Sequence, residues 1–223
     1  LLLNQMGAKI SGIGTNILTI EGVEFLGGVD SIDVIPDRIE AGTFLIAVAA
    51  TGGKVKLNNV DPKHMESVIN LLRKSNIDII NDKKSITVTS NGLDIKACNM
   101  ETHEYPGFPT DLQAQWMLLM SLASGNSTIK ENIYFDRFTH ILELNRLGCD
   151  VHLEDGCATI KGGRSLIGAN VMSTDIRASA ALIIGALCAD GSTNISRVYH
   201  IDRGYDKIEE KLAKVGAKIT RKK

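Results

Sequence analysis

The stretch Pro109-Thr110-Asp111-Leu112-Gln113-Ala114-Gln115 lies midway along the chain and leads from a loop into the apolar segment Trp116 to Ala123. Pro109 and Thr110 predict a helix start, because the proline fixes a turn and the threonine hydroxyl can cap the free amides. Asp111 then falls in the first helical turn, where the helix dipole favours a carboxylate. We expect its side chain to point out of the helix end rather than into the core.

Two other stretches repeat this pattern. They are Pro36-Asp37-Arg38-Ile39-Glu40 and Ser173-Thr174-Asp175-Ile176-Arg177, and each sets an acidic residue before an apolar helix. In all three places a turn of small residues, a short β segment, an amphipathic helix and a further strand follow. The predicted apolar helices are 39–50, 112–123 and 176–189, the amphipathic helices are 63–74, 137–146 and 206–215, and the strands after them are 77–80, 149–153 and 217–220. The sequence therefore predicts three similar α/β units, with residues 2–10 as the end of one more.

The two kinds of helix differ in how much of their surface is apolar. The helix predicted at 176–189 has no polar face beyond its first turn, so it must be buried nearly all round. The helix predicted at 206–215 has one apolar stripe among charged residues and is half exposed. Because Ile86-Thr87-Val88-Thr89 alternates, the strands are expected to be half exposed as well. We therefore expect an α/β fold with apolar helices inside and mixed sheets outside, the reverse of an ordinary barrel.

The composition limits the possible partners. The chain has 223 residues, enough for one large domain or two small ones with a real core. Charged residues make up 23% and the net charge is −1, which gives no electrostatic case for nucleic acid or an anionic membrane as partner. The longest apolar run, residues 178–189, is too short to span a bilayer.

The four cysteines are Cys98, Cys149, Cys157 and Cys188, and none of them pairs at a C-x-x-C spacing. The spacing favours neither a zinc site nor a redox pair, and free thiols are typical of a cytoplasmic protein. The chain has no initiator Met and begins inside an apparent helix. We expect it to be a fragment of a longer protein.

Five motifs follow one another along the chain: Leu3-Asn4-Gln5-Met6-Gly7-Ala8, Pro36-Asp37-Arg38-Ile39-Glu40, Phe108-Pro109-Thr110-Asp111-Leu112-Gln113-Ala114-Gln115, Ser173-Thr174-Asp175-Ile176-Arg177-Ala178-Ser179 and His200-Ile201-Asp202-Arg203-Gly204-Tyr205. In order and spacing they resemble the UDP-N-acetylglucosamine 1-carboxyvinyltransferases of the enolpyruvyl transferase family. The resemblance covers the whole chain. The same motifs fit the sister family that makes enolpyruvylshikimate phosphate poorly.

The resemblance implies a fold of two domains, each an inside-out α/β barrel of three βαβαββ units. Residues 1–35 would be the end of the first domain, and residues 36–223 would be most of the second. It also implies a reaction: the enolpyruvyl group of phosphoenolpyruvate moves to the 3-hydroxyl of UDP-N-acetylglucosamine and phosphate leaves, the first committed step of peptidoglycan synthesis. This chemistry needs a carboxylate to accept a proton, cations to hold phosphate and carboxylate, and a proton donor opposite. It uses no cofactor and no metal.

By the same resemblance, Asp111 is the carboxylate at the sugar 3-hydroxyl and Arg203 belongs to the clamp around phosphoenolpyruvate. Asp175 is an acid close to the reacting centre. Ile133 contacts the UDP-sugar through its backbone, and Arg137 lies near the same pocket. The cysteine that donates the proton belongs to a first-domain loop that this chain does not contain. The chain alone is therefore expected to be inactive and to need the missing N-terminal domain.

Simpler interpretations of the same residues remain open at this point. Asp111 and Asp175 fit ordinary helix-start acids, and Arg203 fits a surface charge. His200 and Asp202 have a spacing that a metal could use, but two ligands do not make a site. For the chain as a whole, the alternatives are a non-catalytic nucleotide-sugar binding module of the same fold and an enolpyruvylshikimate phosphate synthase. A ring-forming clamp protein would need a basic inner face, and no matching excess of Lys and Arg falls on the buried-type helices.

Overall fold

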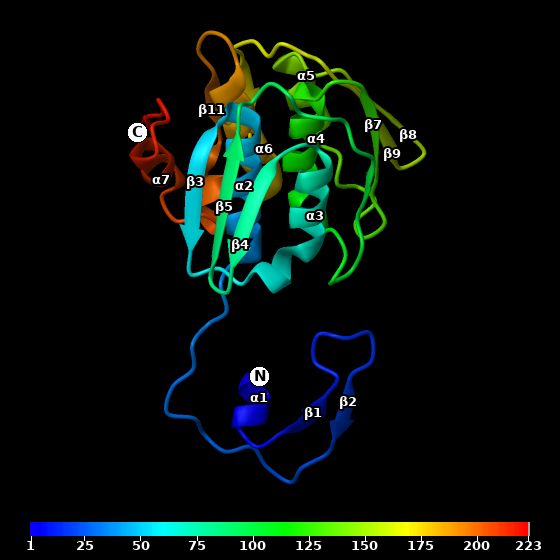
Figure 1. Cartoon of the computed structure of the whole chain (residues 1–223), viewed down its shortest axis with the longest axis vertical. Coiled ribbons are helices and arrows are strands. Elements are labelled where there is room, and N and C mark those ends of the chain that lie inside the picture. The colour runs from blue at the N-terminus through cyan, green and yellow to red at the C-terminus, as the bar shows by residue number, and fades with distance from the viewer. Residues whose placement is uncertain (223) are drawn as a thin grey trace. The chain divides into compact units, whose positions relative to one another are not determined.

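The computed structural model describes residues 1–222, and the chain forms two compact units, Leu1–Pro36 and Asp37–Lys223. Three apolar helices form the centre of the second unit: α2 (Arg38–Thr51), α4 (Gln113–Leu122) and α6 (Ile176–Cys188). Each of them contacts the other two, as Figure 1 shows. In α4 every residue from Gln113 to Ser121 is buried. The prediction of three helices buried nearly all round is confirmed, because a helix without a polar face has to be covered on every side.

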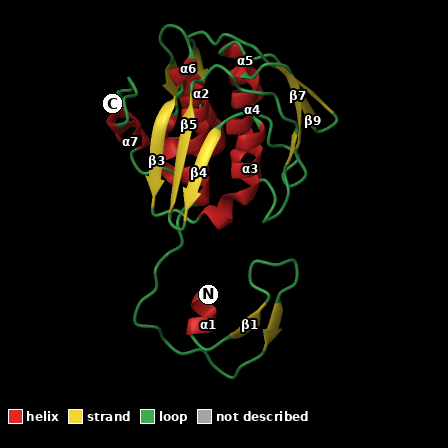
Figure 2. Ribbon diagram, in the orientation of Figure 1, coloured by secondary structure: helices red, strands yellow, loops and turns green. Residues whose placement is uncertain are grey.

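Two sheets cover this helical centre (Figure 2). The first is antiparallel, in the order β3-β5-β4, and packs against α2; its strands are β3 (Gly53–Asn58), β4 (Asp78–Asp82) and β5 (Ser85–Ser90). The second has the order β6-β7-β9-β8 and packs against α4; its strands are β6 (Met100–Glu101), β7 (Asn126–Lys130), β8 (Val151–Glu154) and β9 (Cys157–Lys161). β6 is parallel to β7 and the other pairs are antiparallel, so this sheet is mixed. In β5, Ile86 and Val88 face the core while Thr87 and Thr89 are partly exposed, as the alternation predicted.

The third of the three α/β repeats has the least regular sheet. It consists of β10 (Asn170–Met172) paired in parallel with β11 (Asn194–Ser196). The strand predicted at 217–220 is wrong, because these residues have no strand partner within residues 1–222. Ala217 and Ile219 are half buried against the cluster around α6, and the residues between and after them are exposed. The side chains therefore alternate as in a strand, but the backbone ladder that defines one is missing.

The amphipathic helices lie outside the three apolar ones. They are α3 (Glu66–Lys74), preceded by the 3₁₀ turn η1 (Pro62–Met65), α5 (Ile141–Arg146) and α7 (Ile208–Lys214), preceded by η3 (Val198–Arg203). The predicted start of the second of these helices, at Arg137, is wrong, because residues 137–140 form tight turns and α5 begins at Ile141. The carbonyl of Arg137 accepts a hydrogen bond from Gln113 Nε2 at 3.1 Å instead of one from a helical amide.

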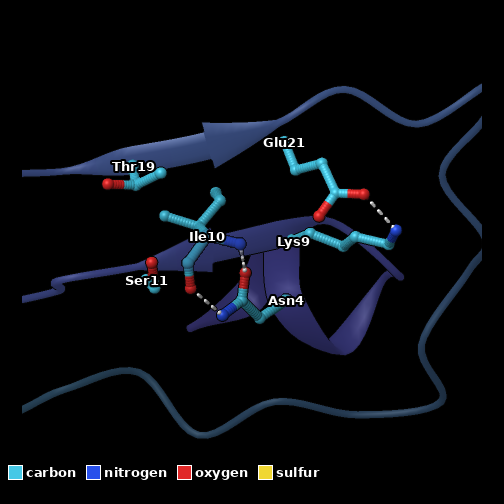
Figure 3. A pocket seen from close by; sticks show the side chains of 6 residues that line it. All are labelled: Asn4, Lys9, Ile10, Ser11, Thr19 and Glu21. Atoms are coloured by element: carbon cyan, nitrogen blue, oxygen red, sulfur yellow. Dashed lines mark hydrogen bonds and ion pairs between the residues drawn. The ribbon is translucent and has the colours of Figure 1, made fainter.

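The first unit contains α1 (Leu2–Gln5) and the antiparallel pair β1 (Lys9–Ser11) and β2 (Thr19–Glu21). Asn4 holds the turn between α1 and β1, because its side chain bonds both the amide and the carbonyl of Ile10, at 3.0 and 2.7 Å (Figure 3). Lys9 and Glu21 form an ion pair across the two strands. No residue in 1–36 is buried. Across the described residues, no helix has the length and apolarity that crossing a membrane requires.

Candidate active site

The three acids that begin the apolar helices have different roles in the structure. Asp37 caps α2, accepting hydrogen bonds from the amides of Ile39 and Glu40 at 2.7 and 3.1 Å. Asp175 caps α6 in the same way, through the amides of Arg177 and Ala178 at 2.7 and 2.9 Å. Both carboxylates satisfy amides that have no partner within the helix, and this explains their place in the sequence without any chemical role.

Asp111 does not cap its helix. It lies in a 3₁₀ turn, η2 (Thr110–Leu112), whose N-cap is Pro109. The predicted capping by Thr110 is wrong, since its hydroxyl oxygen is buried and has no hydrogen-bond partner within residues 1–222. The prediction that Asp111 points away from the core is consistent with its side chain, which is 33% exposed. Because no helix amide uses this carboxylate, it is available to other partners.

Those partners are two arginines from different α/β repeats of the second compact unit. Arg137 Nη1 lies 2.5 Å from Asp111 Oδ1, and Arg177 Nε lies 3.0 Å from the same oxygen. Both guanidinium side chains are 23% exposed, so the cluster is partly screened from water. Charge-assisted bonds of this kind are the strong class of hydrogen bond, and arginine presents further N–H groups that remain free for an anion.

The two arginines set the ionisation of Asp111. Burial is the largest single influence and raises its pKa, but the hydrogen bonds and charges of Arg137 and Arg177 together bring the pKa below the ordinary value of 3.8. The sequence predicted that the helix dipole favours this carboxylate. In the structure two guanidinium groups lower its pKa, and the carboxylate is ionised throughout the neutral range.

The loop after β7 positions both Ile133 and Arg137. Glu131 is buried, and its Oε1 accepts hydrogen bonds from the amides of Ile133 and Tyr134 at 2.9 and 3.0 Å. Thr102 donates a third, at 2.7 Å. This buried carboxylate fixes the loop backbone and leaves the Ile133 side chain 37% exposed. The guanidinium of Arg137 lies over the Tyr134 ring, 5.4 Å from its centroid.

His140 follows the same loop and is completely buried beside the cluster. Burial lowers its pKa to about 4, against the charges of Asp175 and Glu131, which raise it, while that of Arg137 lowers it further. The ring is therefore neutral at physiological pH. Its Nε2 atom is buried and has no hydrogen-bond partner in the part of the chain that the structure describes.

Arg203 is the last residue of η3 and is exposed. Its guanidinium makes no ion pair within residues 1–222. The next residue, Gly204, approaches the start of α6 closely: an added Cβ would lie 3.0 Å from Ile176 Cγ2 and 3.7 Å from Arg177 Nη1. Since Arg177 also contacts Asp111, it is a neighbour shared by the Arg203 turn and the Asp111 carboxylate. The sequence named Arg203 and Asp111 but gave Arg177 no role, although it stands in the Ser173–Ser179 motif.

His200 and Asp202 have a spacing that a metal could use, but the Asp202 carboxylate binds an arginine in the structure. Arg221 holds the Asp202 carboxylate with two bonds, of 2.7 and 2.5 Å. Among residues 1–222, no group of three or more His, Cys, Asp and Glu side chains is placed so that it could hold a metal ion.

Comparison with known proteins gives a consistent result. The chain is 50% identical over 222 residues to the UDP-N-acetylglucosamine 1-carboxyvinyltransferase of Geobacter metallireducens, and the match covers 100% of this chain and 53% of that protein. It is 52% identical to the protein of the same name from Bartonella henselae, covering 98% of this chain and 51% of that one. The chain thus spans about half the length of the curated relatives it matches.

Solved structures share the mixed α/β fold. The enolpyruvyl transferase NikO from Streptomyces tendae superposes with a TM-score of 0.87 at 25% identity, covering 97% of this chain and 52% of that one. An EPSP synthase from Acinetobacter baumannii gives a TM-score of 0.75 at 18% identity, which shows likeness of fold alone. The family model described as EPSP synthase (3-phosphoshikimate 1-carboxyvinyltransferase) matches residues 1–212. With that match over nearly its whole length, the chain belongs to this family of enolpyruvyl transferases.

Proposed function

We propose that this chain is the second half of an enzyme that transfers the enolpyruvyl group of phosphoenolpyruvate to the 3-hydroxyl of UDP-N-acetylglucosamine, in peptidoglycan synthesis. The observation that carries the proposal is the Asp111 carboxylate held between Arg137 and Arg177. This cluster combines a proton acceptor with cations suited to phosphate and carboxylate. The relatives at 50% and 52% identity, which bear the name of this reaction, support the choice of substrates.

In the proposed reaction the sugar hydroxyl attacks C2 of phosphoenolpyruvate and gives its proton to Asp111. C3 of phosphoenolpyruvate takes a proton from a donor outside this chain. In the elimination a proton leaves C3 again for a base outside this chain, the C2=C3 double bond forms, and phosphate departs from C2. Arg203 holds phosphoenolpyruvate, Arg137 and Ile133 face the UDP-sugar, and Asp175 shapes the reacting centre by fixing the start of α6 and thereby Arg177. The motif resemblance supports these roles, and so does the way Gly204 approaches Arg177.

A carboxylate bound by two arginines is a weak base, and the proposed mechanism has to account for this. When the phosphate of phosphoenolpyruvate enters, it competes with Asp111 for the same guanidinium groups. If one arginine turns to the phosphate, Asp111 loses a hydrogen bond that lowers its pKa, and burial, which raises the pKa, gains weight. Substrate binding would thus make Asp111 a better base at the moment when the sugar hydroxyl must lose its proton.

We also propose that residues 36–223 form most of an inside-out α/β barrel and that residues 1–35 are the end of a first domain. The three buried helices with sheets outside support the first assignment. The absence of any buried residue in 1–36 supports the second, because so short a segment cannot bury a core alone. The four cysteines are free, which is in keeping with a cytoplasmic enzyme.

By the resemblance, none of the four cysteines takes the place of the proton donor to C3, and two of them are chemically unsuited to it. Burial raises the pKa of Cys149 to about 11 and that of Cys188 to about 12. Such thiols are poor proton donors at neutral pH. We therefore propose that the chain is inactive alone and that the donor belongs to an N-terminal domain.

The test is to join this chain, in one polypeptide, to the N-terminal half of the Geobacter metallireducens relative and to measure phosphate release. We expect release that needs both phosphoenolpyruvate and UDP-N-acetylglucosamine, and none from the chain alone. Release with shikimate 3-phosphate in place of the nucleotide sugar would favour the enolpyruvylshikimate phosphate synthase instead. Tight binding of UDP-N-acetylglucosamine by the chain alone, without turnover after joining, would favour a binding module.

A further inference from the structure

A buried chain of hydrogen bonds links the turn that carries Arg203 to the turn that carries Asp111. The Tyr205 hydroxyl and Thr43 Oγ1, in α2, are 2.7 Å apart. Gln115, in α4, donates from Nε2 to the same Thr43 oxygen at 3.1 Å and to the backbone carbonyl of Asp111 at 3.2 Å. Three side chains from separate parts of the chain therefore connect residues 205 and 111 through the centre of the unit.

The chemistry of the groups fixes the orientation of Gln115. The carbonyl of Asp111 can only accept, so the side-chain amide must turn its NH₂ group toward it, and the second hydrogen then reaches Thr43. The exposed fractions of Thr43, Gln115 and Tyr205 are only 2%, 0% and 2%. In such surroundings a hydrogen bond is strong, and an unmatched partner is costly. The network therefore ties the three side chains together, while Gln115 Oε1 is buried and has no hydrogen-bond partner within residues 1–222.

A second connection runs along the site itself. Gly204 lies against Ile176 at the start of α6, and Arg177 in the following position contacts Asp111. The turn formed by residues 203–205 is thus attached to the Asp111 turn both through the core and through α6. Arg203, by contrast, has no ion pair within residues 1–222. Its placement depends on the two residues that follow it.

We propose that Tyr205, Thr43 and Gln115 are positioning residues that hold Arg203 at a fixed place relative to Asp111. They touch neither substrate nor reacting atoms and act through the backbone of residues 203–205 and 111. The proposal rests on the function proposed above only where it assigns Arg203 to phosphoenolpyruvate. The coupling between the two turns can be tested without any activity.

The first experiment measures amide hydrogen exchange in the chain. The amides of Gly204 and Tyr205 both bond to the carbonyl of Ile201, at 3.1 and 2.9 Å, and report on the turn. Tyr205→Phe removes only the hydroxyl, and we expect exchange at these two amides to speed up about fivefold, the effect of losing one ordinary hydrogen bond. Exchange in the middle of α4 should not change. The matched control is Tyr199→Phe, in η3 just before the turn and 55% exposed. It removes only a surface hydrogen bond from Arg197 Nε and should leave the turn as it is.

Thr43 offers a second pair of variants. Thr43→Ser keeps the hydroxyl and should behave as the unaltered chain, whereas Thr43→Val removes it with little change of shape and should reproduce the effect of Tyr205→Phe. In the joined enzyme, Tyr205→Phe and Thr43→Val should raise KM for phosphoenolpyruvate about fivefold and change KM for UDP-N-acetylglucosamine little.

The outcomes separate the two proposals. Unchanged exchange at Gly204 and Tyr205 in both Tyr205→Phe and Thr43→Val would overturn the positioning role, whatever the activity. Faster exchange throughout the chain would also overturn it, because the bond would then serve general stability. Faster exchange confined to the turn, in a joined protein that releases no phosphate, would uphold the coupling and count against the proposed reaction.

Discussion

Asp111 differs from the two acids that occupy equivalent places because of the short turn that contains it. Asp37 and Asp175 each have an extended backbone followed directly by an α-helix, and their carboxylates fold back onto the first amides. Asp111 stands inside the 3₁₀ turn η2, two residues before α4 begins at Gln113. A small change of backbone thus converts a capping residue into one whose charge is available to two arginines.

Replacing Asp111 by Asn tests its role as a base. In the joined enzyme we expect Asp111→Asn to lower kcat by about 10²–10⁴, the usual contribution of a positioned acid or base. Steady-state kinetics measures this directly. Asp37→Asn is the matched control, since Asn also caps helices well, and it should cost far less. A loss below about tenfold for Asp111→Asn would place the proton acceptor elsewhere.

His140 should make stability depend on pH. Its pKa is about 4 in the folded chain and 6.5 ordinarily, so below pH 6.5 the unfolded chain binds the extra proton first. The contribution of His140 to the free energy of unfolding is therefore fully present above pH 6.5. It is lost as the pH drops toward 4, by up to about 3 kcal/mol. Urea unfolding at pH 7 and pH 4.5 should show a smaller fall for His140→Gln than for the unaltered chain. Equal falls would mean that the ring has access to water or a partner in the folded state.

At the residue scale, the sequence can name candidate residues but not their contacts. The resemblance drew attention to Asp111, Arg137 and Arg203, and their roles stay predictions. The bond from Arg177 to Asp111 could not be foreseen, because it depends on how α4 and α6 pack side by side. Periodicity within one helix carries no information about the angle at which another helix crosses it.

The packing of α2 against η2 depends on a single glycine. Gly42 lies within α2, and an added Cβ would overlap Cδ1 of Leu112, which is fully buried and would have to shift within the packed core. Glycine is otherwise unfavourable inside a helix, so its presence here is explained by the close approach. This contact also fixes the residue that follows Asp111.

Gly42→Ala should therefore destabilise the chain by about 1–3 kcal/mol through overpacking, despite the better helix propensity of alanine. In a Leu112→Ala background the added methyl group has room, and the same change should stabilise by about 0.5–1 kcal/mol. Urea unfolding of the four proteins measures the coupling. If Gly42→Ala stabilised both backgrounds, the close approach would not be a constraint.

The elements themselves were largely predictable from local pattern. The apolar helices were expected at nearly the right bounds, because helices without a polar face leave a strong signal in the sequence. The strand expected at 217–220 failed for a physical reason: alternation shows which side chains face the core, but a strand also needs a neighbour to bond with. Arg137 was misplaced in α5 because a distant side chain, Gln113, takes its carbonyl.

At the scale of the whole molecule, the two compact units differ in how much of their apolar surface is buried. The second unit encloses a large core formed by its three central helices. The first unit has none, and Phe25, Val34 and Ile17 are 80%, 89% and 74% exposed. A soluble segment rarely exposes so many large apolar side chains without a partner to cover them. The relatives are about twice as long as this chain. Under the proposal made above, a first domain covers these side chains.

The apolar surface of residues 1–36 should be measurable with a dye. The chain alone should bind 8-anilinonaphthalene sulfonate, which fluoresces on exposed apolar surface, and a shortened chain that begins at Asp37 should bind less. Joining the N-terminal half of the Geobacter metallireducens relative should lower the signal of the full chain to the level of the shortened one, because the apolar side chains would then be covered. Fluorescence titration measures all three proteins. Equal dye binding by the full and shortened chains would show that the first unit already covers its own apolar residues and has no need of a further domain.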